Sequence, residues 1–132
     1  MKLNDVYWVA GLIEGEGSFD YNRGTVRIQV AMTDRDIIDR LRTIVNFGSV
    51  REVKRYQAHH KPCFAWSGSG RQAAALMMTI YSLMGQRRKD KIYSILSVWK
   101  KTAARRPSWT LSSKTYWKNL GREHKPKVRS EA

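Results

Sequence analysis

Residues 9–17 run Val-Ala-Gly-Leu-Ile-Glu-Gly-Glu-Gly, an apolar segment that closes with two glutamates set between glycines. Gly11 and Gly15 are four residues apart, so in a helix they lie on one face. Small residues on a helix face let a second backbone approach closely. We therefore expect two copies of this helix to pack about a twofold axis, with an interface built on Ala10, Gly11 and Gly15.

The helix that carries this segment is predicted to start at a cap formed by Asn4 or Asp5. From there to residue 13 its side chains are almost wholly apolar. A surface helix has a polar stripe. A helix without one is expected to be buried on most sides, against its own domain and against a partner.

The period of the apolar residues changes to two between Ser18 and Met32, with a turn at Asn22-Arg23-Gly24. This alternation predicts a strand hairpin. One face is expected to join the core. The other face carries Ser18, Asp20, Thr25, Arg27, Gln29 and Ala31. All of these except Ala31 have side chains that can form hydrogen bonds.

The rest of the chain repeats this alternation of helix and hairpin. Thr33 and Asp36 resemble a capping box before a helix that ends at residues 46–48. A second hairpin is predicted over 50–56 and 63–67, and helices over 73–84 and 92–99. The predicted order is αββαββαα in an α+β domain over residues 1–100. Residues 101–132 are expected to form a basic C-terminal tail, with a short helix possible over 113–121.

The charge is strongly unbalanced: 25 Lys and Arg against 11 Asp and Glu give a formal net charge of +14. Residues 100–132 hold ten of the basic residues and two of the acidic ones. Such an excess indicates a polyanionic partner, with nucleic acid first. No apolar run is long enough to cross a bilayer, so a membrane partner is not expected.

The cysteine count excludes two other classes of protein. Cys63 is the only cysteine, so the chain can build neither a disulfide framework nor a thiolate zinc cluster. The first residues lack the features of a secretory signal. We expect an intracellular protein.

The histidines and methionines are not expected to bind a metal or a cofactor. His59, His60 and His124 lack the spacing of zinc ligands. Met77, Met78 and Met84 are expected to fill the core.

The nine residues from Val9 to Gly17 resemble the motif of the LAGLIDADG homing endonucleases. Seven of the nine positions agree if Glu is accepted for Asp, and Trp8, Ser18 and Phe19 also fit. The αββαββα order over residues 4–99 is similar to that of the family, whereas the tail lies outside the resemblance. The resemblance implies a homodimer whose antiparallel sheets form a saddle on double-stranded DNA, and an intron-homing activity that makes metal-dependent double-strand breaks.

Glu16 matches the last acid of the motif, which in the family binds the metal together with the preceding backbone carbonyl, here that of Gly15. Mg²⁺ typically uses one or two carboxylates plus substrate oxygens, and it lowers the pKa of the attacking water. Mn²⁺ is the alternative ion. The acid corresponding to Glu14 is chiefly structural in the family, and a direct metal role for it is the less favoured hypothesis.

Several side chains are expected to contact DNA or assist the reaction. On the first hairpin, Arg and Gln are types that pair with guanine and adenine edges, and the family lays its sheet on DNA in this way. The second hairpin could extend the surface. Relatives place an assisting basic residue in the segment matching residues 86–89, where we choose Arg87; a plain phosphate contact is the alternative. The expected DNA-binding residues are Arg23, Arg27, Gln29, Arg51, Arg55 and Lys61.

Three function classes remain open: a homing endonuclease, a cleavage-inactive relative that regulates by binding DNA, and a maturase-like protein that binds intron RNA. The two inactive classes need the basic surface but have no use for Glu16. The presence of this acid favours cleavage. A glycine-rich helix end with solvated glutamates is the structural alternative for the whole segment.

Overall fold

The computed structural model describes residues 1–54 and 61–104. Its elements are α1 (Leu3–Glu16), β1 (Gly17–Asn22), β2 (Thr25–Met32), α2 (Arg35–Val45), β3 (Ser49–Val53), β4 (Cys63–Ser69), α3 (Gly70–Ile80), a 3₁₀ turn η1 (Tyr81–Leu83) and α4 (Gln86–Ala104). The predicted αββαββαα order in an α+β fold is confirmed. The expected strand over 50–56 is β3, which ends at Val53, and its last two residues fall outside the described residues. Arg55, His59, His60, His124 and the possible helix over 113–121 also lie outside them.

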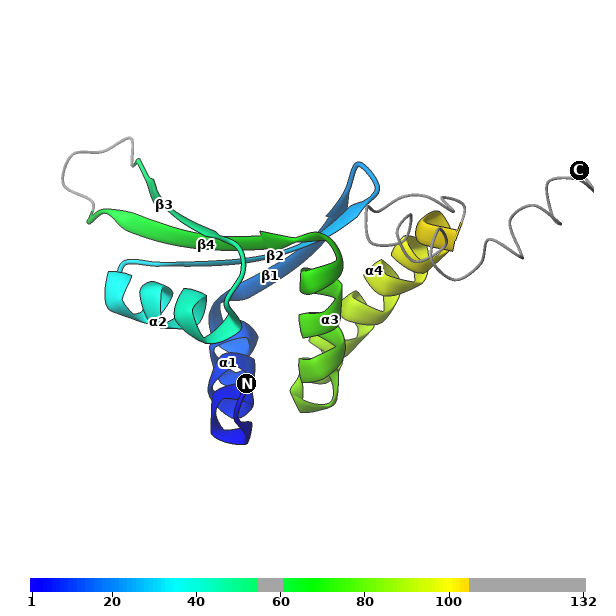
Figure 1. The fold of residues 1–132 in the computed structure, drawn as a ribbon, viewed down its shortest axis with the longest axis horizontal. Helices are drawn as coiled ribbons and strands as arrows, with labels where there is room; N and C mark the ends of the chain where they lie inside the picture. Colours follow the sequence, from blue (N-terminus) through cyan, green and yellow to red (C-terminus); the bar gives the residue numbers. More distant parts are fainter. Residues whose placement is uncertain (55–60, 105–132) are drawn as a thin grey trace, which may run out of the picture. The chain divides into compact units, whose positions relative to one another are not determined.

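The four strands form one antiparallel sheet in the order β1-β2-β4-β3 (Figure 1). The first hairpin turns at Arg23 and Gly24, which both have positive φ, 53° and 82°. A two-residue turn of this kind matches the twist of the flanking strands, and glycine adopts it without steric cost. The predicted hairpins, and the two faces of the first one, are therefore confirmed.

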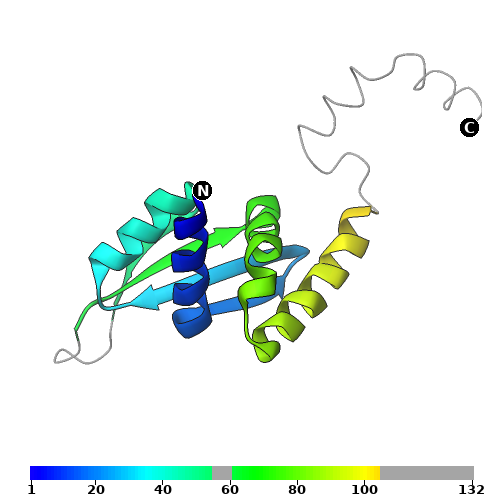
Figure 2. The same cartoon turned by 90° about the horizontal axis from the view of Figure 1, so that it is seen from below.

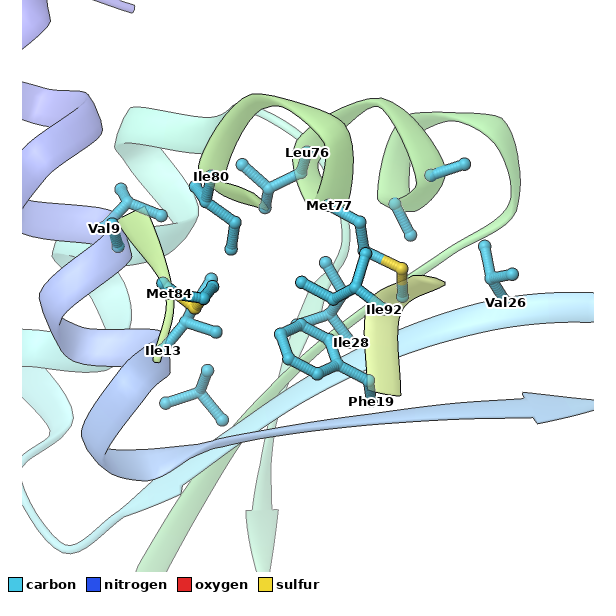
Figure 3. Close-up of a cluster of buried hydrophobic side chains, with 14 of the residues drawn as sticks. Val9, Ile13, Phe19, Val26, Ile28, Leu76, Met77, Ile80, Met84 and Ile92 are labelled. Atoms are coloured by element: carbon cyan, nitrogen blue, oxygen red, sulfur yellow. The ribbon is translucent and has the colours of Figure 1, made fainter. Parts of the chain in front are cut away.

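The four helices lie on one face of the sheet, and α1 lies between α2 and α3 (Figures 1 and 2). Figure 3 shows side chains of α1, α3 and α4 meeting the inward face of β1 and β2. The fully buried members include Val9 and Ile13 of α1, Ile28 of β2, Met77 of α3 and Ile92 of α4. Burial of a side chain of this size stabilises the fold by about 1.5–3 kcal/mol, so this cluster fixes α1 on the sheet.

Four local expectations were wrong. α1 begins at Leu3 after Lys2, so neither Asn4 nor Asp5 is its cap. The cap of α2 is Asp34 rather than Thr33. Met78 is 57% exposed and is not part of the core. Residues 86–89, expected between two helices, form the first turn of α4. Gln, Arg and Lys have high helix propensity, which lets the helix start before the apolar residues from Ile92 onward.

Contacts divide the chain into Met1–Trp99 and Lys100–Ala132. The side chains of the candidate site lie in Met1–Trp99. Among the described residues, no helix is long and apolar enough to cross a membrane.

Candidate functional site

The end of α1 brings the motif to the sheet, because β1 follows α1 without a loop. The Gly17 backbone N–H donates to the Ile13 carbonyl and closes the last turn. A Cβ on Gly17 would lie 2.7 Å from that carbonyl oxygen, so only glycine fits this tight junction. The local sequence thus places Glu16 at the point where the helix meets the sheet.

Glu16 is exposed, and the described part of the chain gives its carboxylate no hydrogen bond or ion pair. It lies in the last turn of α1, which contains no basic residue. The C-terminal end of a helix carries partial negative charge and unpaired carbonyl groups. A carboxylate here is unfavourable in isolation and becomes favourable when a cation binds.

Glu14 has the opposite surroundings although it is only two residues away. Its Oε1 accepts a hydrogen bond of 2.6 Å from the backbone N–H of Gly85, the residue before α4. Its Oε2 lies 3.6 Å from Nε of Arg88, an ion pair too long for a hydrogen bond. Glu14 therefore caps α4 and ties it to α1, which supports the structural role expected for this acid.

Arg88 completes this connection, which we call the α1–α4 latch (Glu14, Gly17, Gly85 and Arg88). Its side chain is 11% exposed, its Nη1 donates to the Gly17 carbonyl, and its guanidinium lies 5.8 Å from the Phe19 ring centroid. Arg87, which the sequence favoured for this segment, is exposed. Neighbouring helical residues point about 100° apart, so only one of the two arginines can face the junction.

The donors at the end of α1 fit a hard divalent cation such as Mg²⁺, which takes carboxylate and carbonyl oxygens. Glu16 supplies the carboxylate, and the last turn supplies carbonyl groups, that of Gly15 among them. Within the ranges described, no three His, Cys, Asp or Glu side chains gather into a cluster. A cation at Glu16 would need further oxygens from a substrate or from a second subunit.

One face of α1 is exposed, and it carries two apolar side chains followed by two glycines. Leu3 and Tyr7 are 66% and 54% exposed, and Gly11 and Gly15 follow at the same four-residue interval. A Cβ on either glycine would meet nothing within 4 Å. Ala10 was assigned to this face incorrectly: it is 4% exposed and belongs to the chain's own core. Leu3 and Tyr7 were missed because an almost wholly apolar helix does not show which of its side chains face its own domain.

The outward face of the sheet carries the polar residues of the first hairpin. Gln29 pairs with Ser18 on β1 and with Ser67 on β4. Directly paired residues point to the same side of a sheet. By the same register Arg51 on β3 shares this face with Gln29, through Ala65 and Ala31. By this register three of the expected contact residues, Arg27, Gln29 and Arg51, share one face of the sheet. Their neighbours Ile28 and Val30 are buried in the core, so this face is the one turned away from the helices. Figure 1 shows the helices on the other side of the sheet.

Arg27 on this face is already held by a carboxylate. Its Nε lies 3.2 Å from both Asp20 oxygens, and its Nη2 lies 2.5 Å from Oδ2 of Asp20 across the β1–β2 pair. The hydrogen bond and the charge of Asp20 raise the pKa of Arg27. Asp20 thus fixes the direction in which the guanidinium points. The sequence placed Asp20 on this face but did not pair it with Arg27.

The remaining predicted contact residues lie at the edges of the described sheet. Arg23 is exposed at the tip of the first hairpin, and Lys61 is exposed just before β4. Arg55 lies outside the described residues. Arg23 and Lys61 are placed at opposite ends of the sheet surface, since β2 and β4 run antiparallel with Met32 opposite Phe64 and Arg27 opposite Ser69.

The chain is similar to known proteins in its structure and not in its sequence. No family model and no curated protein sequence matches this chain. The group I intron-encoded homing endonuclease I-CeuI, complexed with DNA, is 8% identical with a TM-score of 0.59, over 85% of this chain and 61% of that one. The archaeal intron-encoded homing endonuclease I-Vdi141I, complexed with DNA, is 12% identical with a TM-score of 0.51, over 89% and 98%.

The match to I-CeuI spans less than two thirds of that protein's length, whereas the match to I-Vdi141I spans nearly all of it. At these identities the likeness establishes the fold. The chain therefore has an α+β fold like that of these two homing endonucleases.

Proposed function

We propose that this protein is a homing endonuclease of the LAGLIDADG type, which cuts both strands of a specific DNA site as a homodimer. The observation that carries the proposal is Glu16: an exposed carboxylate, without a partner among the described side chains, at the C-terminal end of α1. The fold of two DNA-complexed homing endonucleases and the net charge of +14 support it. An intracellular location follows from such a substrate.

The homodimer is proposed from the exposed face of α1. Leu3 and Tyr7 expose apolar surface that water disfavours, and Gly11 and Gly15 leave room for a second backbone. Two copies packed through this face would bring two Glu16 carboxylates together at the ends of the paired helices. One chain has one such motif, and a double-strand break needs two reacting centres.

In the proposed reaction Glu16, with the Gly15 carbonyl, would hold Mg²⁺ or Mn²⁺. When bound, the ion neutralises phosphate charge and lowers the pKa of the attacking water. Arg87 stabilises charge on the phosphate, since a guanidinium does not act as a base. Arg88 and Glu14 position the α1–β1 junction and do not touch the reacting atoms. Arg27, Gln29 and Arg51, with Arg23, Lys61 and Arg55, contact the DNA site.

A cleavage-inactive DNA-binding regulator or an RNA-binding maturase is the alternative. Both would use the outward face of the sheet, and neither explains an exposed acid at a helix end that contains no basic residue. A cleavage assay separates the classes. Purified protein is mixed with DNA that contains the uninterrupted flanking sequence of its own gene, with and without Mg²⁺.

We expect site-specific double-strand cleavage in Mg²⁺ and binding without cleavage in EDTA. Binding of this DNA with no cleavage in either Mg²⁺ or Mn²⁺ would contradict an endonuclease and favour a regulator. Tighter binding of the corresponding intron RNA than of the DNA would favour a maturase. Sedimentation on the DNA tests the dimer, and a monomer that cuts both strands would contradict it.

A further inference from the structure

A groove lies between the start of β1 and the first half of α4, with a volume of about 540 Å³. The residues Gly17, Ser18 and Phe19 line one side, and they follow Glu16 directly in the chain. The other side is lined by residues of α4, namely Arg87, Arg88, Asp90, Lys91 and Ser94. This β1–α4 groove is separate from the outward face of the sheet, because α4 lies with the other helices on the opposite face (Figure 2).

Four charged side chains line the β1–α4 groove. Two of them bond to other residues of the chain, and the other two are exposed. Arg88 is held by Gly17 and Glu14 in the latch. The carboxylate of Asp90 accepts a 2.8 Å hydrogen bond from Nε2 of Gln86. Arg87 and Lys91 are exposed, and residues 1–54 and 61–104 provide neither of them with an ion pair or hydrogen bond.

Arg87 and Lys91 are four residues apart, so they lie on one face of α4 about one helical turn from each other. Ser94, three residues after Lys91, adds an exposed hydroxyl group on the same helix. Phe19, which also lines the groove, is 5% exposed. Two cations and a hydroxyl donor beside a hollow suit an anion with several acceptor oxygens, as a phosphodiester has.

We propose that the β1–α4 groove binds the phosphodiester backbone of a DNA strand, so that the DNA footprint of each subunit extends from the sheet onto α4. The proposal rests on the proposed action on DNA and adds a binding site that carries no sequence information. Arg87 and Lys91 make the charged contacts, and Ser94 donates a hydrogen bond. Because the groove starts at the residue after Glu16, the backbone it holds belongs to the strand next to the cutting centre.

The salt dependence of binding tests this groove apart from catalysis. The groove variant Arg87→Gln/Lys91→Gln is compared with the control Lys2→Gln/Lys89→Gln, which removes the same charge. Lys2 precedes α1, at the other end of that helix from Glu16, and Nζ of Lys89 lies 6.0 Å from the Tyr81 ring centroid and does not line the groove. Lys2, Arg87 and Lys91 are exposed and Lys89 is partly buried. Thermal unfolding checks that both variants are folded.

Binding to fluorescein-labelled DNA duplexes of two unrelated sequences is measured in EDTA over a series of KCl concentrations. Each phosphate contact contributes about 0.9 to the slope of log binding constant against log salt, so the groove variant should lose about 1.8 and the control almost nothing. The single variant Lys91→Gln should lose about 0.9. Both sequences should be weakened alike.

Equal slopes for the groove variant and the control would overturn the proposal. A slope change seen on duplex RNA but not on duplex DNA would also overturn it, and would assign the groove to RNA. If the slopes differ as expected but the wild type cuts no DNA, the endonuclease proposal fails and the groove stands. If the wild type cuts DNA and the slopes are equal, only the groove fails.

Discussion

The two glutamates at the end of α1 are separated by one residue and face opposite environments. Glu14 caps α4 through Gly85 and pairs with Arg88. Glu16 is exposed, and no side chain of the described ranges partners it. The same contrast divides the glycines, because Gly17 is enclosed by Ile13 while Gly11 and Gly15 face open space.

This contrast separates two groups of residues. The residues of the α1–α4 latch make their hydrogen bonds and contacts inside the chain, so changing them should alter the free energy of unfolding. Gly11, Gly15 and Glu16 are exposed and have no such contacts inside the described chain, so changing them should leave folding intact and alter dimer formation or cleavage.

The largest loss of stability is expected for Gly17→Ala. The new Cβ would lie 2.7 Å from both the carbonyl oxygen and Cγ2 of Ile13, so the backbone must shift. Overpacking of this kind costs about 1–3 kcal/mol, and we expect the upper part of that range. Denaturant unfolding measures it, with Gly15→Ala as the matched control. Equal stability of the two variants would show that the junction is not tightly packed.

A somewhat smaller loss is expected for Glu14→Ala. The change removes the cap of α4 and leaves Arg88, 11% exposed, without its charge partner. Loss of a helix cap costs roughly 0.5–2 kcal/mol, and the unpaired guanidinium adds to that. Glu16→Ala is the control and should change the free energy of unfolding by less than about 0.5 kcal/mol. A reversed order of the two variants would refute the division.

Gly11→Ala should stabilise the isolated chain and weaken the dimer. Alanine is favoured over glycine within a helix by roughly 0.5–1 kcal/mol, and the new methyl group meets nothing within 4 Å inside the chain. In the proposed dimer that methyl group would separate two packed helices. Unfolding at low protein concentration and sedimentation at high concentration measure the two effects. An unchanged association constant would place the interface elsewhere.

The smallest effect on stability is expected for Asp20→Asn. Asp20 and Arg27 are 42% and 44% exposed, and a cross-strand ion pair at such a site contributes about 0.2–1 kcal/mol. Loss of the carboxylate should let the Arg27 guanidinium move and relax base preference at one position of the DNA site. Cleavage of a randomised target library measures the preference. A preference as sharp as that of the wild type would show that Asp20 does not orient Arg27.

Much of this fold could be predicted because its signals are local. The alternation from Ser18 to Met32 and the turn at Arg23 and Gly24 specify the first hairpin and its faces. The motif likewise placed Glu16 at the end of a helix, where the structure has it. Periodicity and turn residues are properties of short segments, and a single sequence displays them directly.

What the sequence could not predict depends on contacts between segments far apart in the chain. That Arg88 and not Arg87 faces the α1–β1 junction depends on how α4 is rotated against α1, and the sequence between them does not fix that rotation. The assignment of Ala10 to the interface had the same cause, because an almost wholly apolar helix does not reveal which face its own domain covers. Helix starts were misplaced because α1 and α2 have no side-chain cap at their first turns.

The most direct test of the account compares cleavage and binding by the wild type and Glu16→Gln on the same DNA. Glutamine keeps the size of the side chain and removes the charge that would hold the metal ion. We predict that double-strand cleavage in Mg²⁺ is abolished, while DNA binding is kept or slightly strengthened because a negative charge near phosphate is lost. Cleavage by Glu16→Gln at the wild-type rate would contradict the assignment of Glu16 as the metal-binding carboxylate.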